Sequence, residues 1–170
     1  MCSSKVLELF FDDPDSFFHI REIARRVKLH PNTVLHDVHL RVKDGLLIKR
    51  RTRAVVEVSA NRDAPQYYSL KRLYNLRQIY LSGVVDFLYK EYGAPEAMVL
   101  FGSYSRGEDT LRSDIDLAII TKRSLNLDVQ PYEKLLKHTI QLHEIDLQKV
   151  GKNFITNLAN GIVLKGYLNI

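Results

Sequence analysis

Two short apolar runs joined by a polar loop constrain the fold of this chain more than any other feature. The runs cover Ala97 to Phe101 and Ile115 to Ile120, and their length and apolar character are typical of buried strands. Asp114 and Asp116 stand at the start of the second run. Because residues i and i+2 of a strand share a face, the two carboxylates are predicted to lie side by side, while Ile115 points into a core.

A Gly-Ser turn stands ahead of the two aspartates, and together these features indicate a phosphoryl-transfer site. Carboxylate oxygens are preferred ligands of Mg²⁺, and two such ions can clamp the attacking and leaving oxygens of a displacement at phosphorus. Gly102 allows the backbone to approach a triphosphate, and Ser103 offers a hydroxyl and an N–H at the start of a predicted short helix. Either feature alone is common in ordinary turns and solvated strands. A Walker A loop is excluded, since Glu108 and Asp109 stand where Lys and Ser or Thr are required.

This stretch resembles the motif of the DNA polymerase β-like nucleotidyltransferase superfamily, in its minimal branch. The motif is a Gly-Ser turn, often followed by Arg-Gly, and then Ser-Asp-x-Asp-Leu; here its residues are Gly102, Ser103, Arg106, Gly107, Ser113, Asp114, Asp116 and Leu117. The resemblance covers about Ala94 to Ile170. It implies transfer of a nucleoside monophosphate, AMP from ATP in the first instance, to an acceptor. Asp114 and Asp116 would then hold Mg²⁺ or Mn²⁺, and Gly102, Ser103 and Arg106 would bind the nucleotide.

The resemblance also implies a third carboxylate on a later strand. The segment from His143 to Val150 alternates apolar and polar residues and predicts that strand. Asp146, which precedes an apolar residue as in the family's pattern, is the preferred third acid, as metal ligand or as base toward an acceptor hydroxyl, and Glu144 is the alternative. His138 and His143 are interpreted as surface or capping residues, because their spacing matches no zinc site.

Apolar residues at helical spacing predict a helix from Pro131 to Leu142 between the acidic strands. The expected element order after residue 93 is strand, short helix, strand, helix, strand, helix. This order predicts an α/β (α+β) nucleotidyltransferase fold with a small mixed sheet.

The first half of the chain differs in charge and layout. Residues 1–92 hold 16 Lys and Arg and 11 Asp and Glu (net +5), whereas residues 93–170 hold 9 and 9 (net zero). This excess favours a polyanionic partner. The predicted helices are Lys5 to Phe11, Phe18 to Val27 and Asn32 to Asp44, and the predicted strands are Leu46 to Arg50, Val55 to Val58 and Gln66 to Leu70.

This layout resembles a winged helix-turn-helix, as in many prokaryotic repressors. The resemblance implies that the helix from Pro31 to Lys43 enters the major groove of double-stranded DNA. The candidate base-reading residues are Asn32, Thr33 and His36, and the candidate phosphate contacts are Lys49, Arg50, Arg51 and Arg53. Two features count against DNA binding: His30 stands where a Ser, Thr or Asp cap is usual, and Asp37 and Asp44 place negative charge on the helix. The alternative is a dimer or protein-interaction module.

A single long helix is predicted from Leu70 to Tyr92, as the first helix of the second domain or as a connector that pairs with its copy in a homodimer. The predicted domains are therefore residues 1–69, a winged helix-turn-helix, and residues 70–170, a nucleotidyltransferase domain. Two domains fit 170 residues with 45% hydrophobic content. The lone Cys2 excludes an internal disulfide, and the absence of a membrane-span pattern or signal peptide favours a cytoplasmic protein.

Two classes of function fit these features. The first is a Mg²⁺-dependent nucleotidyltransferase with a DNA-binding winged helix, which the three acids favour. The second is a DNA-binding transcription regulator whose nucleotidyltransferase-like half senses nucleotide or mediates assembly without catalysis. Polymerase activity is disfavoured, because the catalytic half has no room for the additional domains that hold a template or growing strand. The resemblance to the minimal branch implies a HEPN-type helical protein as acceptor, and hence protein AMPylation within a toxin–antitoxin pair.

Overall fold

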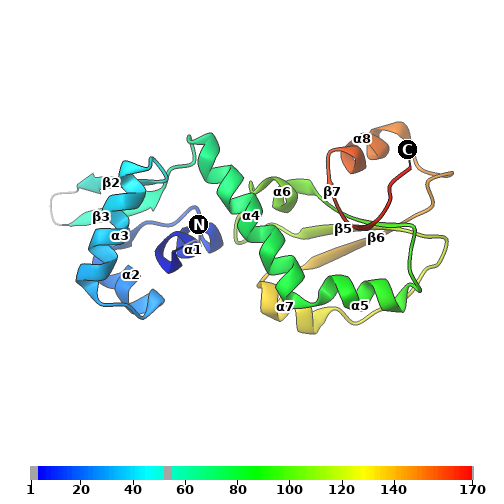
Figure 1. Ribbon diagram of the computed structural model, residues 1–170, viewed down its shortest axis with the longest axis horizontal. Coiled ribbons are helices and arrows are strands. Elements are labelled where there is room, and N and C mark those ends of the chain that lie inside the picture. The colour runs from blue at the N-terminus through cyan, green and yellow to red at the C-terminus, as the bar shows by residue number, and fades with distance from the viewer. Residues whose placement is uncertain (1–3, 52–54, 170) are drawn as a thin grey trace. The chain divides into compact units, whose positions relative to one another are not determined.

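The chain folds into two units, each with a core of its own. The structure is a computed structural model that describes residues 4–51 and 55–169, without the side chains of Lys152 and Asn153. The units are Met1–Tyr74 and Asn75–Ile170, and the boundary falls inside helix α4 (Pro65–Ser82). The mixed α/β class with small sheets agrees with the prediction (Figure 1). Among the described residues, no helix combines the length and the apolar content needed to cross a bilayer.

The N-terminal unit packs helices on a small antiparallel sheet. Its helices are α1 (Lys5–Asp12), α2 (Ile20–Val27), α3 (Pro31–Lys43) and the first part of α4. Its strands are β1 (Phe18–His19), β2 (Leu47–Arg51) and β3 (Val56–Ala60), in the order β1-β3-β2. The core consists of buried side chains from these elements, among them Phe10, Ile23, Val38, Leu47 and Val58.

Local hydrogen bonds explain where two of these helices begin. Ser4 Oγ accepts a hydrogen bond from the Leu7 backbone N–H at 3.2 Å and caps α1. Helix α3 begins at Pro31, whose fixed φ suits the first helical position. His30 Nδ1 accepts a hydrogen bond from the Asn32 backbone N–H at 3.3 Å. His30 therefore provides the cap that the sequence analysis expected from a Ser, Thr or Asp.

The C-terminal unit is built on a four-stranded mixed sheet. Its strands are β4 (Ala97–Phe101), β5 (Ile115–Ile120), β6 (Ile140–Ile145) and β7 (Ile162–Gly166), in the order β6-β5-β4-β7. Strands β5 and β6 are parallel, whereas β4 is antiparallel to β5 and to β7. The helices are the second part of α4, α5 (Val84–Glu91), α6 (Gly102–Arg106), α7 (Gln130–Leu136) and α8 (Lys152–Ala159).

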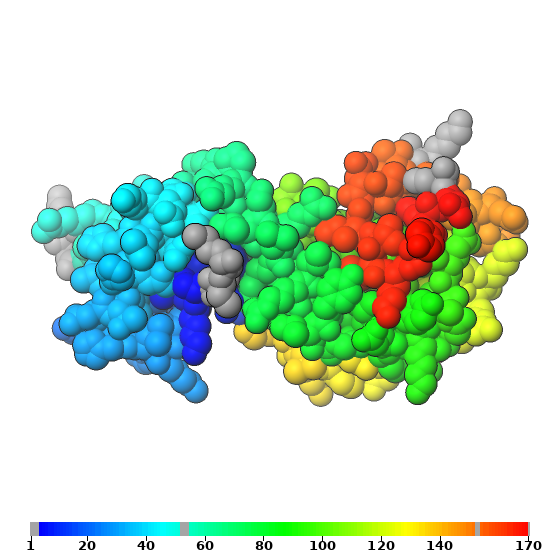
Figure 2. Space-filling model, viewed as in Figure 1, coloured from blue at the N-terminus to red at the C-terminus, as the bar shows by residue number. Residues whose placement is uncertain are grey.

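Helices cover both faces of this sheet. One face packs on α5 and α7 through Met98, Leu100 and Leu117, and the other packs on α8 through Val99 and Ala118 (Figure 1). Because strand residues alternate between faces, Asp116 lies on the α8 face. The closing segment after β7 runs over the surface of the unit (Figure 2), where Tyr167 is 83% exposed.

The structure differs from the predicted helices at three places. The helix predicted from Leu70 to Tyr92 is two helices, because Gly83 adopts a left-handed conformation (φ +79°) between α4 and α5. The strand predicted from Gln66 to Leu70 is wrong, since Pro65 begins α4 and this segment is helical. The helix predicted from Phe18 begins at Ile20, because the preceding pair of residues joins the sheet as β1.

Two boundaries of the C-terminal unit also differ. The helix predicted from Pro131 to Leu142 ends at Leu136, and Lys137 leaves it with φ +59° before β6 starts. The strand predicted from His143 to Val150 ends at Ile145. Asp146 Oδ1 accepts a hydrogen bond from the Gln148 backbone N–H at 3.1 Å, which closes a turn at that point.

Candidate functional site

The two aspartates of the motif lie at the start of β5, where the sequence analysis placed them. Asp116 is the second residue of the strand and is partly exposed, and Asp114 precedes the strand and is exposed. Asp114 also borders a shallow pocket of about 420 Å³ that Glu133 and His138 help to line. His138 Nδ1 lies 2.7 Å from the Ser113 carbonyl oxygen and fixes the turn that presents Asp114.

Gly102 is in direct contact with Asp116. Antiparallel pairing sets Phe101 opposite Asp116, so the turn after β4 reaches the acidic end of β5. Gly102 has φ +74°, which favours glycine, and a Cβ atom built on it would overlap Asp116 Oδ2. The Gly-Ser turn and the acidic strand are therefore parts of one site, and that site needs a glycine both for its backbone conformation and for space.

Helix α6 carries the other residues predicted to bind nucleotide. Ser103 is its second residue and is half-buried. Arg106 ends the helix, and its Nε lies 2.7 Å from Glu108 Oε2. Asp109, noted in the sequence only because it excludes a Walker A loop, is buried and accepts a hydrogen bond from Asn75 Nδ2 at 2.6 Å. Asn75 also donates to the Tyr104 carbonyl oxygen at 2.9 Å, so this buried pair anchors α6 and its loop.

His143 lies closer to Asp116 than a surface or capping role would require. Its Nε2 lies 3.2 Å from Asp116 Oδ1. Parallel pairing of β5 and β6 sets Ala118 opposite His143, which places the imidazole on the face that carries Asp116. The ring packs edge-on against Phe101, with 5.2 Å between ring centroids. The sequence offered no signal for this contact, because it depends on the register between two strands.

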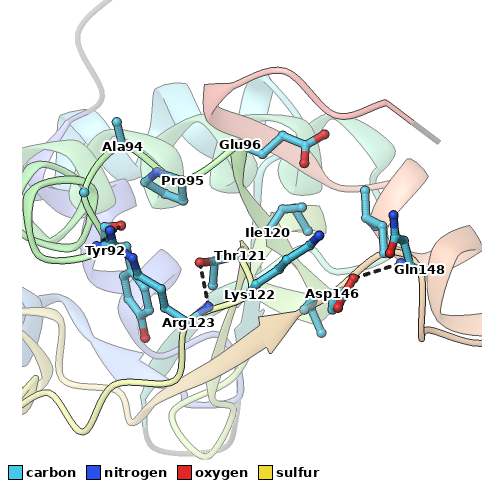
Figure 3. A pocket seen from close by; sticks show the side chains of 13 residues that line it. Tyr92, Ala94, Pro95, Glu96, Ile120, Thr121, Lys122, Arg123, Asp146 and Gln148 are labelled. Atoms are coloured by element: carbon cyan, nitrogen blue, oxygen red, sulfur yellow. Dashed lines mark hydrogen bonds between the residues drawn. The ribbon is translucent and has the colours of Figure 1, made fainter.

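Asp146 lies at the opposite end of the sheet from Asp116. Asp116 pairs with Gln141, and Asp146 follows that partner by five residues, which at strand spacing is a separation of roughly 16 Å. Asp146 lines another pocket, of about 440 Å³, together with Thr121, Lys122 and Arg123 (Figure 3). The structure therefore does not bring the predicted third acid to the two aspartates.

Glu144, the alternative third acid, faces away from the aspartates. Its Oε1 accepts hydrogen bonds from the Tyr92 hydroxyl at 2.7 Å and from the Leu125 backbone N–H at 2.6 Å. Burial acts to raise the pKa of Glu144, but the hydrogen bonds from Ser124, Leu125 and Tyr92 outweigh it and hold the pKa below its ordinary value. Burial and the same carboxylate raise the pKa of the Tyr92 hydroxyl. Glu144 therefore anchors the loop after β5.

In the part of the chain that the structure describes, the acidic end of β5 lacks a complete set of protein ligands for a metal ion. Among the described residues, no three His, Cys, Asp or Glu side chains are grouped closely enough to hold a metal ion. Mg²⁺, however, is commonly bound by one or two carboxylates together with phosphate oxygens of a substrate. Asp116, beside the Gly-Ser turn, and Asp114, just before β5, are the carboxylates that could take part in such binding.

The predicted base-reading residues are exposed on α3. Asn32, Thr33 and His36 all lie on its open surface. The acids that counted against DNA binding are paired: Arg41 Nε lies 3.1 Å from Asp37 Oδ1, and Arg41 Nη1 lies 3.2 Å from Asp44 Oδ2. The unfavourable charge on this helix is therefore compensated within the helix itself.

Three of the four predicted phosphate contacts lie on β2. Arg50 and Arg51 are exposed at the end of β2, and Lys49 is half-buried, with its pKa lowered by that burial. Arg53 lies outside the described residues.

Comparison with known families supports one half of the chain. The family model described as "Polymerase beta, Nucleotidyltransferase" matches residues 85–167. No curated protein and no solved structure matches the chain. The matched region contains the Gly-Ser turn, both aspartates and all four strands of the mixed sheet, and it supports a nucleotidyltransferase-type activity for this part of the chain.

Proposed function

We propose that the C-terminal unit transfers a nucleoside monophosphate, AMP from ATP in the first instance, to a hydroxyl group of an acceptor. The observation that carries the proposal is the contact between Gly102 and Asp116, which joins the phosphate-binding turn to the acidic strand. In this reaction the acceptor oxygen forms a bond to the α-phosphorus and gives up its proton to water. The bond from the α-phosphorus to the bridging oxygen breaks, and pyrophosphate leaves with the electron pair. The match to residues 85–167 supports this class of reaction.

Each residue of the site has a defined part in this proposal. Asp114 and Asp116 would hold Mg²⁺ or Mn²⁺, which neutralises phosphate charge when bound. Ser103 offers its hydroxyl to the phosphates, and Arg106 offers a positive charge at the end of α6. Asp146 lies too far along β6 to share a cation with the two aspartates and has no part in the proposal.

The experiment that tests the proposal follows labelled AMP. The purified chain is incubated with ATP labelled at the α-phosphate, Mg²⁺ or Mn²⁺, and candidate acceptors. A HEPN-type helical protein comes first, since the resemblance to the minimal branch suggests a toxin–antitoxin pair. We expect transfer by the parent and none by Asp114→Asn/Asp116→Asn. Glu91→Gln, which removes an exposed carboxylate on α5, serves as the control and should transfer at the parent rate. Equal transfer by the double variant would overturn the proposal.

A second function, binding of double-stranded DNA, is proposed for the N-terminal unit. The exposure of Asn32, Thr33 and His36 on α3 and the internal pairing of Asp37 and Asp44 support it. If the C-terminal unit lacked transferase activity, a DNA-binding regulator that senses nucleotide would remain as the alternative.

Salt titration of duplex binding distinguishes residues that bind phosphates from residues that read bases. Arg50→Ala/Arg51→Ala should weaken binding to every duplex and reduce the slope of log K against log salt by about one unit for each arginine replaced. Asn32→Ala should leave the slope unchanged and cost about 1–3 kcal/mol at one base pair. Lys90→Ala, a change of an exposed lysine on α5, is the control. Parent binding no tighter than that of a neutral protein at about 0.1 M salt would instead favour a dimer or partner module.

A further inference from the structure

The strand next to the two aspartates presents an imidazole where a third carboxylate would complete a three-acid site. Strand β6 lies beside β5 at the edge of the sheet, and its residues on the face of Asp116 are Gln141, His143 and Ile145. None of these side chains is acidic. The acids in this part of the chain, Glu144 and Asp146, lie on the other face and past the end of β6 respectively.

The imidazole holds the Asp116 carboxylate in one orientation. His143 Nε2 lies 3.2 Å from Oδ1, while Gly102 lies so close to Oδ2 that a Cβ atom at position 102 would overlap it. The imidazole ring is itself positioned by two aromatic neighbours, Phe101 at 5.2 Å and Phe154 of α8 at 6.1 Å between centroids. Its side chain is 36% exposed and that of Asp116 is 29% exposed, so the pair is accessible to a bound ligand.

The formal charge of the carboxylates limits how many cations the site can bind. Two carboxylates carry a formal charge that balances one divalent cation, and a second cation needs further negative charge from protein or substrate. Two-metal sites hold ions roughly 4 Å apart, which requires carboxylates that can bridge them or bind each one. Here one oxygen of Asp116 is engaged by an imidazole, and no third carboxylate of the described residues joins the pair.

We propose that His143 is a positioning residue for Asp116, and that this imidazole in place of a third acid makes the site bind one divalent cation per nucleotide instead of two. This inference rests on the proposed function, because it assumes that nucleotide binds where Gly102 meets Asp116.

The test counts ions in the assembled complex without any reaction. The full chain is dialysed to equilibrium against Mn²⁺ and an ATP analogue with a methylene group between the α- and β-phosphates, and retained Mn²⁺ and analogue are measured. The parent should retain one Mn²⁺ per analogue and give the electron paramagnetic resonance spectrum of an isolated ion. His143→Asp, which supplies the third carboxylate, should retain two and show coupling between neighbouring ions. His143→Gln, which keeps a hydrogen-bond donor, should behave as the parent does.

Each result bears on a distinct claim. Two Mn²⁺ per analogue in the parent, or one in a folded His143→Asp variant, would overturn the role given to His143 and leave the nucleotide site standing. Retention of neither ion nor analogue by the parent would overturn the proposed function and this inference with it. Thermal unfolding of each variant confirms that it is folded before the ions are counted.

Discussion

The two ends of the C-terminal sheet carry acids of opposite character. At the end where β4 finishes and β5 begins, Asp114 is exposed and Asp116 is partly exposed, close to Gly102. At the other end, Glu144 accepts hydrogen bonds that include those from Tyr92 and Leu125, and Asp146 closes a turn. Carboxylates are therefore accessible at one end of the sheet, whereas at the other end they stabilise local structure.

The hydrogen bonds that a carboxylate makes, more than its residue type, distinguish an acid that can bind a ligand from one that stabilises local structure. Asp116 Oδ1 lies next to the His143 imidazole and Oδ2 lies close to Gly102, and both neighbours come from other segments of the chain. Asp146 accepts from the backbone N–H two residues ahead, a contact that any aspartate in such a turn makes.

The largest expected effect separates the two ends directly. Asp116→Asn should lower the rate of AMP transfer by more than about 100-fold, because it removes a proposed cation ligand. Asp146→Asn should keep the rate within about twofold, since a local turn and the ion pair with Lys149 account for its contacts. Initial rates with labelled ATP give both values. A large loss of transfer rate in a folded Asp146→Asn variant would show that both ends of the sheet take part in the reaction. It would contradict the proposed difference between the two ends.

The second expected effect concerns two glycines that have positive φ angles. Gly102→Ala should destabilise the fold by about 1–3 kcal/mol, from strain at positive φ, and should also displace the Asp116 carboxylate. Gly83→Ala is the matched control, because it has φ +79° and no atom within 4 Å of an added Cβ. Urea unfolding and AMP transfer should show similar strain in both variants but a loss of transfer only in Gly102→Ala. Parent-like transfer by Gly102→Ala would show that the close approach is unimportant.

A smaller effect concerns the residue that positions Asp116. His143→Ala should lower AMP transfer by about 10- to 100-fold, the usual cost of removing a residue that orients a ligand, with a smaller loss in His143→Gln. His138→Ala, which removes a contact with the turn before Asp114 and an edge-on contact with Tyr104 but none with Asp116, is the comparison variant. An equal loss in Ala and Gln variants at 143 would contradict a role through the hydrogen bond.

The smallest effect is a pH dependence at the other end. The pKa of Glu144 is lowered on folding, so its stabilisation is present above its unfolded pKa of about 4.3 and is lost as the pH falls through the lowered value. Glu144→Gln should cost on the order of 1 kcal/mol of unfolding free energy at pH 7, and the difference from the parent should shrink below about pH 4. Thermal melts across this pH range measure it. A constant difference at all pH values would assign the effect to packing.

Local sequence signals predicted much of this arrangement. The strands at Ala97 to Phe101 and Ile115 to Ile120 and the glycine turn between them follow from residue patterns over a few positions. The match to residues 85–167 supports the nucleotidyltransferase assignment that those patterns favoured.

The parts that the sequence could not predict depend on contacts between distant segments. The position of His143 next to Asp116 follows from the parallel register of β5 and β6, which no local pattern encodes. The alternating pattern from His143 to Val150 predicted a longer strand. In such a pattern, an aspartate whose side chain accepts a hydrogen bond in a turn cannot be distinguished from a polar residue of a strand, as at Asp146. The break at Gly83 was hidden by continuous helical spacing on both sides.

The central claim is that nucleotide and cation bind at the end of the sheet where Gly102 meets Asp116. Its most direct test is the nuclear magnetic resonance spectrum of the ¹⁵N-labelled chain with the methylene ATP analogue, recorded with Mg²⁺ and then with Mn²⁺, whose unpaired electrons broaden nearby amide signals. We predict the strongest broadening at Gly102, Ser103 and Asp116, with signals at Thr121 and Asp146 much less affected. Broadening centred on Asp146 and Thr121 would place the ligand at the opposite end and contradict the claim.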